Sequence, residues 1–400
     1  MIILVVNVGS TSLKFRLFSM EDETILAEGK IERVGSSSSP FSYHYGKKEK
    51  TVDMIECPDY RTAIKQALDT ITDPDVGVLS SLDKLDAVGF KPVHARNIAD
   101  SVFITEDVIR AMEDYIPLAP AHNPPYINAF RIFQKLLPGK PLIGVFEPAF
   151  HKTIPDVAYT YSIPYEWSQK HSIRRYGFHG ASHRYVSVRA PELAGCHQNN
   201  LKIISCHLGG SASICAIKNG ASVETSMGFS PQSGLPHATR NGDLDPFILL
   251  YIMKKEGLSS DELFNALVCN GGLKGISGTS GDVRDLEKEA AEGNARAKLA
   301  LGVFVHETRK YIGAYTAVLE GLDILAFTGG IGENSSMIRE RICQGFEFLG
   351  IQLDRKRNNA TGRELLISDD KSQVKIVVIP ANEELIVARE SARFLASSGH

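Results

Sequence analysis

Apolar residues open the chain as a continuous run, which predicts a strand buried on both faces. Residues 2–8 are apolar apart from Asn7, and residues 9–12 are the small ones that a tight turn needs. Apolar and polar residues then alternate over positions 13–18, which predicts an antiparallel return strand. Lys14 lies just past the turn, where its ammonium could face a bound phosphate, although a solvated strand lysine is the simpler interpretation.

The same arrangement, an apolar run followed by a turn of small residues, occurs twice more. Residues 203–206 lead through His207 into the tip 209–211, and residues 323–327 lead into the glycine-rich segment 328–334. Backbone N–H groups of such turns can approach a phosphate closely because no side chain intervenes. One glycine tip is most often only a turn, but three in one chain favour a site for a nucleotide.

The remaining periodicity alternates strands with helices, which predicts an α/β protein. Ser182 is expected to cap a helix that begins near His183, and residues 35–40 are expected to form a surface loop. Prolines 124 and 125 are expected to keep the next helix from starting before residue 126. Further strands are predicted at 85–88, 141–146 and 374–379, and further helices at 61–71, 105–115, 126–137, 245–255, 260–268, from 336 and from 383. A long helical region is predicted from 282 to about 319, with a break near Gly293.

Composition narrows the class of protein. The chain has 400 residues, of which 43% are hydrophobic, and a formal net charge of −3, so it lacks the basic footprint of a nucleic-acid-binding protein. No apolar run approaches the roughly 20 residues of a membrane span. Its six cysteines show no paired CxxC spacing, which argues against zinc and fits reduced thiols. We expect a cytoplasmic protein of two domains that binds neither nucleic acid nor membrane.

Two segments carry side chains suited to phosphoryl transfer. Arg240 lies between small polar residues in a predicted loop downstream of the glycine tip, and an arginine fork near such a tip can hold a transferring phosphoryl group. His179 lies between Phe178 and Gly180, where the backbone is bare. A lone histidine is usually a structural hydrogen-bonding group, so structural and substrate-contacting roles stay open for His179.

Six motifs follow one another along the chain: Asn7-Val-Gly-Ser-Thr-Ser-Leu-Lys14, Tyr176-Gly-Phe-His-Gly-Ala-Ser-His183, Thr239-Arg-Asn-Gly-Asp243, Asp282-Val-Arg-Asp285, Gly329-Gly-Ile-Gly-Glu-Asn334 and Asn382-Glu-Glu-Leu385. In this order they resemble the acetate kinase family, within the actin and sugar-kinase superfamily, over nearly the whole chain. The resemblance implies two RNase H-like (actin-like ATPase) domains with a hinged central cleft. It implies an acyl-acceptor and phosphate domain of residues 1–150 plus 384–400, a nucleotide-binding domain of residues 151–383, and a homodimer.

The resemblance also implies transfer of the ATP γ-phosphoryl group to a short carboxylic acid, with Mg²⁺ as the metal. Asn7 and Glu383 would hold Mg²⁺, and His179, Arg240 and Glu147 would be catalytic. Substrate-binding positions would be Lys91, Val93, His122, Phe178 and Pro231. ATP would contact Lys14, His207, Leu208, Gly209, Gly210, Ser211, Asp282, Val283, Arg284, Gly330, Ile331, Gly332, Glu333 and Asn334.

Departures from the family pattern gather at the acceptor end. Lys91 replaces an arginine and Glu147 replaces an aspartate, Ala121 replaces a larger apolar residue, and Gly210 and Ser211 replace Asn-Gly. A lysine is a point charge where arginine is a planar fork, so we expect a rebuilt acceptor pocket. The acceptor could be acetate, or propionate, butyrate or a substituted acid. A catalytically weak ATP-binding regulatory protein is the alternative, although such a protein would not need the transition-state charges of His179 and Arg240.

Overall fold

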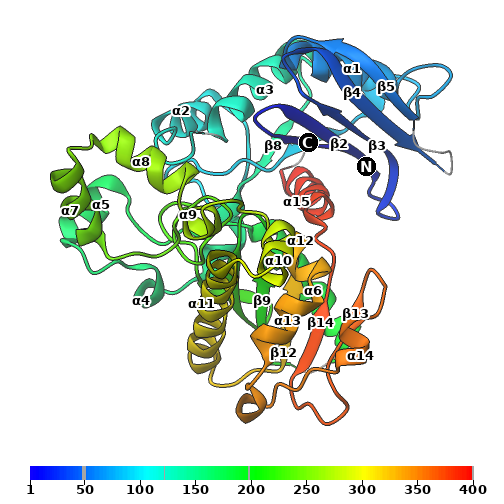
Figure 1. Cartoon of the computed structure of the whole chain (residues 1–400). Helices are drawn as coiled ribbons and strands as arrows, with labels where there is room; N and C mark the ends of the chain where they lie inside the picture. Colours follow the sequence, from blue (N-terminus) through cyan, green and yellow to red (C-terminus); the bar gives the residue numbers. More distant parts are fainter. Residues whose placement is uncertain (47–50, 121, 197–198, 399–400) are drawn as a thin grey trace. The chain divides into compact units, whose positions relative to one another are not determined.

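Two mixed β-sheets organise the computed structural model of this chain, which describes residues 1–46, 51–120, 122–196 and 199–398 (Figure 1). Each sheet belongs to one of two structural units. Unit 1 comprises Met1–Ala149 together with Asn382–His400, and unit 2 comprises Phe150–Ala381. The α/β class predicted from the sequence is confirmed.

Unit 1 contains a sheet of order β5-β4-β3-β2-β1-β6-β8-β7, in which β1, β6 and β8 are parallel and the other pairings are antiparallel. Helices α1 and α3 pack on one face through a large apolar core, and α15 covers the opposite face around Ile3 and Val5. The elements are β1 Ile2–Val8, β2 Ser12–Ser19, β3 Thr24–Glu32, β4 Ser36–Tyr45, β5 Thr51–Cys57, α1 Tyr60–Ile71, β6 Ala87–Phe90, β7 Ser101–Phe103, α2 Glu106–Asp114, α3 Asn123–Leu136, β8 Leu142–Val145 and α15 Glu383–Ser397. A 3-10 helix covers Leu82–Lys84 and another covers Glu147–Thr153 at the end of the first segment.

Unit 2 contains a sheet of order β11-β10-β9-β12-β14-β13, with β9, β12 and β14 parallel. Helix α6 packs on one face, and α10, α11 and α13 contribute to the core on the other. The elements are α4 Asp156–Tyr159, α5 Tyr165–His171, α6 Gly180–Ala194, β9 Lys202–His207, β10 Ser213–Lys218, β11 Ala221–Thr225, α7 Pro246–Glu256, α8 Ser260–Cys269, α9 Gly272–Ser277, α10 Val283–Ala291, α11 Ala295–Leu319, β12 Ile324–Thr328, α12 Gly329–Asn334, α13 Ser336–Cys343, a 3-10 helix Glu347–Leu349, α14 Arg355–Asn358, β13 Leu365–Leu366 and β14 Lys375–Val378.

Both sheets share one plan at their centres. A first strand (β1 or β9) pairs with its hairpin partner on one side and runs parallel to a later strand on the other. These central strands are buried on both faces, which explains their nearly continuous apolar sequences. Because the carboxyl ends of parallel strands meet at one edge, residues that follow β1, β6 and β8 are brought together, as are those that follow β9 and β12.

Several local predictions were wrong, for identifiable reasons. Helix α6 begins at Gly180 rather than near His183, because His179 adopts a left-handed backbone (φ 56°) that ends the extended segment. Helix α3 begins at Asn123, and its two prolines occupy the first turn, where their missing N–H groups have no intrahelical partner to lose.

Two predicted turns also belong to regular elements. Segment 329–334 forms helix α12 instead of an irregular turn, since Gly329 takes a positive φ of 77° and the chain coils at once after β12. Residues 36–40 belong to strand β4, in which a register shift between Ser36 and Ser39 accommodates the serine run. Within the described ranges no helix is long and apolar enough to cross a membrane.

Candidate active site

Three charged side chains meet in unit 1 at the ends of its parallel strands. The Lys91 ammonium lies 2.8 Å from a Glu147 carboxylate oxygen and 2.5 Å from a Glu383 carboxylate oxygen. Their side chains are only 15%, 7% and 17% exposed, so the cluster is largely shielded from solvent. Such shielding makes each charge depend strongly on its neighbours.

The backbone explains why these residues meet. Lys91 follows the last residue of β6, Glu147 follows β8 after one further residue, and Glu383 lies in the first turn of α15. The Glu147 N–H donates to the Pro92 carbonyl oxygen at 3.0 Å and fixes the two strand ends against each other. The extra methylene of a glutamate lets residue 147 reach the ammonium of a lysine, so the two sequence departures form one ion pair.

Burial alone would lower the pKa of Lys91, but the carboxylates of Glu147 and Glu383 outweigh it and raise the pKa well above its usual 10.5. Lys91 is therefore a cation throughout the physiological range. With both carboxylates ionised, the cluster carries a net charge of −1.

Asn7 lies near the end of β1, and its side-chain oxygen accepts a hydrogen bond of 3.1 Å from the Tyr126 hydroxyl. Burial raises the pKa of Tyr126, since it disfavours the phenolate, so this hydroxyl keeps its proton and donates it. The sequence did not single out Tyr126, although its place in the first turns of a proline-initiated helix could have suggested it. Lys14 pairs with Asn7 in the β1–β2 register, and its side chain is exposed.

The other predicted acceptor residues of unit 1 lie on the segments around this cluster. Val93 is buried, and the His94 carbonyl beside it accepts a hydrogen bond of 2.9 Å from Asn123. His122 occupies the N-cap position of α3 and is partly buried. Ala121 lies outside the described residues.

In unit 2, His179 is held by a strained backbone and by its neighbours. Its positive φ is unusual for a residue with a side chain and is a feature that gathers at functional sites. The His179 Nδ1 lies 2.8 Å from the Ser213 hydroxyl, and its ring stacks on that of His207 with centroids 4.1 Å apart. Phe178 beside it is buried. These contacts fix the orientation of the imidazole before any ligand binds.

A buried histidine, His183, contacts the same serine that holds His179. His183 lies 2.8 Å from the Ser213 hydroxyl and 2.9 Å from that of Ser205, so it shares Ser213 with His179. Burial, assisted by His151 and His207, holds the pKa of His183 well below its usual 6.5. Burial also lowers the pKa of His151 to about 4, and burial with nearby Arg240 lowers that of His237 to about 3.

These neutral histidines predict a loss of stability in acid. Below about pH 6.5 the unfolded chain binds protons that the folded chain refuses, so stability falls from pH 6.5 toward the folded pKa near 4 for His151. Each such histidine contributes a slope of about 1.4 kcal/mol per pH unit over its own window. Urea unfolding followed by fluorescence of Trp167, the chain's single tryptophan and a residue of unit 2, measures this slope.

The control for the pH experiment is a pair of variants. His151→Asn is expected to reduce the slope between pH 6.5 and 4 by the contribution of one proton, whereas exposed His306→Gln leaves it unchanged. An unaltered slope in His151→Asn would contradict the assignment.

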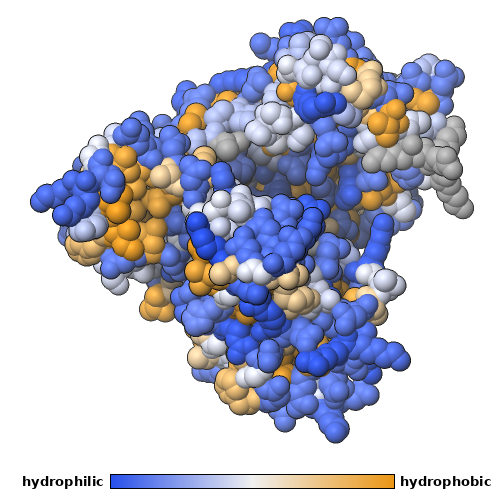
Figure 2. Space-filling view, in the orientation of Figure 1, coloured by the Kyte–Doolittle hydropathy of each residue, from blue (hydrophilic) through white to orange (hydrophobic). Residues whose placement is uncertain are grey.

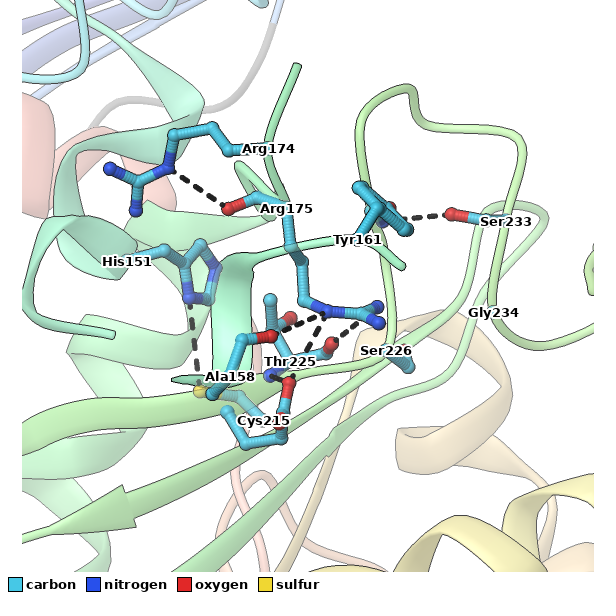
Figure 3. A network of polar contacts seen from close by, with 12 residues as sticks. His151, Ala158, Tyr161, Arg174, Arg175, Cys215, Thr225, Ser226, Ser233 and Gly234 are labelled. Atoms are coloured by element: carbon cyan, nitrogen blue, oxygen red, sulfur yellow. Dashed lines mark hydrogen bonds and ion pairs between the residues drawn. The ribbon is translucent and has the colours of Figure 1, made fainter. Parts of the chain in front are cut away.

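The loop that carries Pro231 and Arg240 is anchored by residues shown in Figure 3. Arg175 donates to the Ala158 and Thr225 carbonyl oxygens at 3.4 and 3.3 Å, and Tyr161 lies against the loop, where its hydroxyl accepts the Phe229 N–H. A Cβ at Gly228 would lie 1.9 Å from the Tyr161 hydroxyl, so a side chain there would displace Tyr161. The loop is thereby fixed at its base.

Arg240 is a partly buried cation with few partners among the described residues. Its guanidinium donates to the Pro231 carbonyl at 2.7 Å and to the Ser211 hydroxyl at 3.3 Å. Burial lowers its pKa from 12.5, which leaves it charged, and no carboxylate among the described residues forms an ion pair with it. Buried Arg339, in contrast, donates four hydrogen bonds to carbonyl and amide oxygens. A partly shielded guanidinium whose remaining donors are unused within the described chain is suited to an incoming anion.

A cavity of about 750 Å³ gathers most of the residues expected to hold ATP. That volume is typical of small-molecule sites. Among the predicted residues, those that line it are Gly209, Gly210, Asp282, Val283, Arg284, Gly330, Ile331 and Asn334. Ala238, Gly281, Glu287 and Ser335 also line it and were not predicted.

The other predicted nucleotide residues do not line this cavity. Leu208 is fully buried, and its carbonyl accepts hydrogen bonds from the Ile331 and Gly332 N–H groups, so it shapes the wall from behind. Glu333 accepts a hydrogen bond from the Ala381 N–H at 3.0 Å. His207 and Ser211 contact His179 and Arg240, respectively, while Lys14 belongs to unit 1.

The donor set of unit 1 fits a magnesium ion. Asn7 and Glu383 offer one amide oxygen and one carboxylate, and the buried side-chain oxygen of Asn382 has no hydrogen-bond partner among the residues that the structure describes. Mg²⁺ uses few protein oxygens because it keeps water and substrate phosphates as ligands. No group of three or more histidine, cysteine or acidic side chains suited to a metal occurs in the described part of the chain.

Comparison with known proteins decides the family. The sequence profile described as "Acetokinase family" matches residues 2–389. The chain belongs to the acetokinase family. It is similar to an acetate kinase of Caldanaerobacter subterraneus subsp. tengcongensis (46% identity, 98% of each chain covered) and to one of Halothermothrix orenii (47% identity, 99% and 100% covered).

Solved structures agree with this membership of the acetokinase family. A crystal structure of Porphyromonas gingivalis acetate kinase superimposes with a TM-score of 0.88 at 40% identity, covering 98% of this chain and 99% of that one. A propionate kinase of Francisella tularensis gives a TM-score of 0.88 at 37% identity, covering 97% and 98%. The predicted two-domain actin-like ATPase fold is thus confirmed, as is the predicted enzyme class, a phosphotransferase with a carboxyl acceptor.

Proposed function

We propose that this member of the acetokinase family transfers the γ-phosphoryl group of ATP reversibly to acetate or a related short carboxylic acid such as propionate. The observation that carries the proposal is Arg240, a partly buried guanidinium beside the glycine tip of the β9–β10 hairpin, with donors that no described residue accepts. The adjoining cavity supports it with a volume and backbone lining suited to a nucleotide. The names of the similar proteins support acetate and propionate as acceptors.

The chemistry requires positioning more than acid–base catalysis. An acceptor carboxylate is already ionised at pH 7, so one of its oxygens can attack the γ-phosphorus directly. A new carboxyl O–P bond forms while the bond from the γ-phosphorus to the bridging oxygen breaks, which leaves ADP and an acyl phosphate. Arg240 would stabilise charge on the equatorial oxygens, and His179, oriented by Ser213, would donate a hydrogen bond to the same group.

Mg²⁺ would be held by Asn7 and Glu383, and it would offset the negative charge of the nucleotide phosphates. Tyr126 orients the Asn7 amide so that its oxygen faces the hydroxyl, and one lone pair of that oxygen remains for the metal. Gly330 lies in the first turn of helix α12 and lines the cavity, so its backbone can approach a phosphate closely.

Lys91 and Glu147 bear on which carboxylic acid serves as the phosphoryl acceptor. Val93, Phe178 and Pro231 are buried apolar residues suited to a short acyl chain. The Lys91 ammonium is shared between the carboxylates of Glu147 and Glu383, which weakens its interaction with the carboxylate of a substrate. That pairing favours a second candidate, a kinase of the same type whose preferred acid carries another polar group.

Trapping of acyl phosphate as hydroxamate tests both candidates. The intact protein is given MgATP with acetate, propionate, butyrate or hydroxylated short acids. Fastest turnover with acetate or propionate supports the first candidate, and fastest turnover with a substituted acid supports the second. No hydroxamate from any acid, despite ATP binding, would contradict the proposed function.

A homodimer is also proposed, because helix α7 of unit 2 presents an apolar surface. Among the described residues α7 contains no buried side chain, yet Leu250 and Tyr251 are 63% and 61% exposed. Phe264 of α8 and Trp167 of α5 are exposed large apolar side chains as well. Figure 2 shows hydrophobic surface where Figure 1 places α5 and α7. Exposed apolar patches of this kind mark protein interfaces.

Charged residues on α7 are therefore expected to separate the dimer. The double variant Leu250→Glu with Tyr251→Glu should run as a monomer in light scattering after size exclusion, since two central apolar anchors are typically worth about 4 kcal/mol together. Leu299→Glu on α11, at a residue that is 57% exposed, is the matched control and should keep the mass of the parent protein. A dimeric mass for the α7 variant would contradict the interface.

A cytoplasmic location stays a prediction, supported by six free thiols.

A further inference from the structure

We propose that the Lys91 ammonium is an internal counter-ion that competes with the divalent metal for Glu383. The inference rests on the proposed role of Glu383 as a metal ligand. Its basis is geometric: the ammonium lies 2.5 Å from one Glu383 carboxylate oxygen, a position that removes that oxygen from metal coordination while the pair persists. A cation held there by the chain occupies the electrostatic position that Mg²⁺ needs.

Glu147 makes the competition effective. Its carboxylate holds the same ammonium at 2.8 Å and is itself almost fully buried, so Lys91 is fixed from two sides. An ammonium shared by two shielded carboxylates cannot be withdrawn without leaving buried charge uncompensated. A metal ion that arrives alone must displace Lys91 from Glu383, and the free energy of breaking that shielded ion pair opposes its binding.

Nucleotide changes this balance. When the metal arrives on ATP or ADP, the phosphates supply most of its ligands, and Glu383 needs to contribute only one oxygen. Lys91 then keeps Glu147 and gains a free N–H donor, which the substrate carboxylate can accept. Metal–nucleotide binding and acid binding are therefore positively coupled through Lys91, and each increases the affinity for the other by the same factor.

Binding of Mn²⁺ as a probe for Mg²⁺, measured by electron paramagnetic resonance of the free ion, tests the competition without turnover. The intact protein is titrated without nucleotide and again with ADP. The variants are Lys91→Met, Glu383→Gln and the double variant, and Lys30→Met is the matched control because Lys30 forms an ion pair with Glu32 elsewhere in unit 1. Thermal unfolding checks that each variant folds.

Without nucleotide, Lys91→Met is expected to bind Mn²⁺ at least about tenfold more tightly than the parent protein, since two carboxylates lose their counter-ion. Glu383→Gln in the same background should abolish the gain, and Lys30→Met should show none. Equal affinity in the parent and in Lys91→Met, or a gain that survives Glu383→Gln, would overturn the competition.

A comparison of Glu383→Gln with the parent protein tests the inference even where Lys91→Met does not fold. Glu383→Gln alone should leave the nucleotide-free affinity for Mn²⁺ unchanged and should weaken binding only with ADP present. Dependence on Glu383 without nucleotide would overturn the competition. Loss of the dependence with ADP would instead remove Glu383 from the proposed metal site.

Discussion

Arg240→Ala is expected to lower kcat for acyl-phosphate formation by about 10³-fold or more, the scale of an arginine that stabilises a transferring phosphoryl group. The reason is that Arg240 is the partly buried cation beside Ser211 on the glycine tip, and alanine leaves the charge on the equatorial oxygens unmatched. The measurement is kcat by the hydroxamate assay with saturating MgATP and acid.

Two further arginine variants are the controls for the kcat of Arg240→Ala. Arg240→Lys keeps a positive charge without the planar fork and should fall between the parent and alanine. Exposed Arg355→Ala, which removes a surface ion pair with Glu340, should leave kcat unchanged. A kcat of Arg240→Ala close to that of the parent would exclude Arg240 from the transfer step.

Gly272→Ala is expected to destabilise unit 2 by about 3–5 kcal/mol and to reduce activity with it. Gly272 is buried with φ +58°, and a Cβ there would lie 2.2 Å from the His237 carbonyl oxygen and 2.6 Å from that of Arg240. The start of α9 is bonded to the same loop, since the Leu273 N–H donates to the His237 carbonyl at 2.9 Å. A side chain at 272 therefore displaces the backbone that positions Arg240.

Gly302→Ala provides the matched comparison for this prediction. Gly302 lies within helix α11, and no heavy atom outside its own helix comes within 4 Å of a Cβ placed there. Alanine at 302 should be neutral or stabilise by up to about 1 kcal/mol, because it restricts the unfolded chain. Urea unfolding followed by Trp167 fluorescence compares the two, and equal stabilities would show that the loop can move away from residue 272.

The sequence predicted elements and motifs well because both are local. Apolar periodicity placed β1 and the helix from residue 61 within a residue or two, and the strand-and-turn repeat located both glycine segments that line the cavity. The errors arose where backbone conformation departs from the usual preference of a residue. His179 with a positive φ is the example that moved the start of α6.

The pairings within the site could not be predicted from the sequence. Lys91 and Glu383 are 292 residues apart, and Tyr126 and Asn7 are 119 apart, so only the folded sheet brings them together. The departures at positions 91 and 147 were visible as separate changes, but their mutual ion pair was not. Family roles assigned to single positions describe the parts, whereas the charge balance among them is a property of the tertiary structure.

The path of the chain through the two units fixes the order in which they can be completed during synthesis. Unit 2 is one continuous segment, Phe150–Ala381, whereas unit 1 needs both ends of the chain. Until α15 leaves the ribosome, Ile3 and Val5 on β1 lack the helix that covers them, and Lys91 lacks Glu383. The first unit to be translated is therefore the last to be finished, and a chain that ends before residue 383 lacks the helix that packs on β1, β6, β7 and β8.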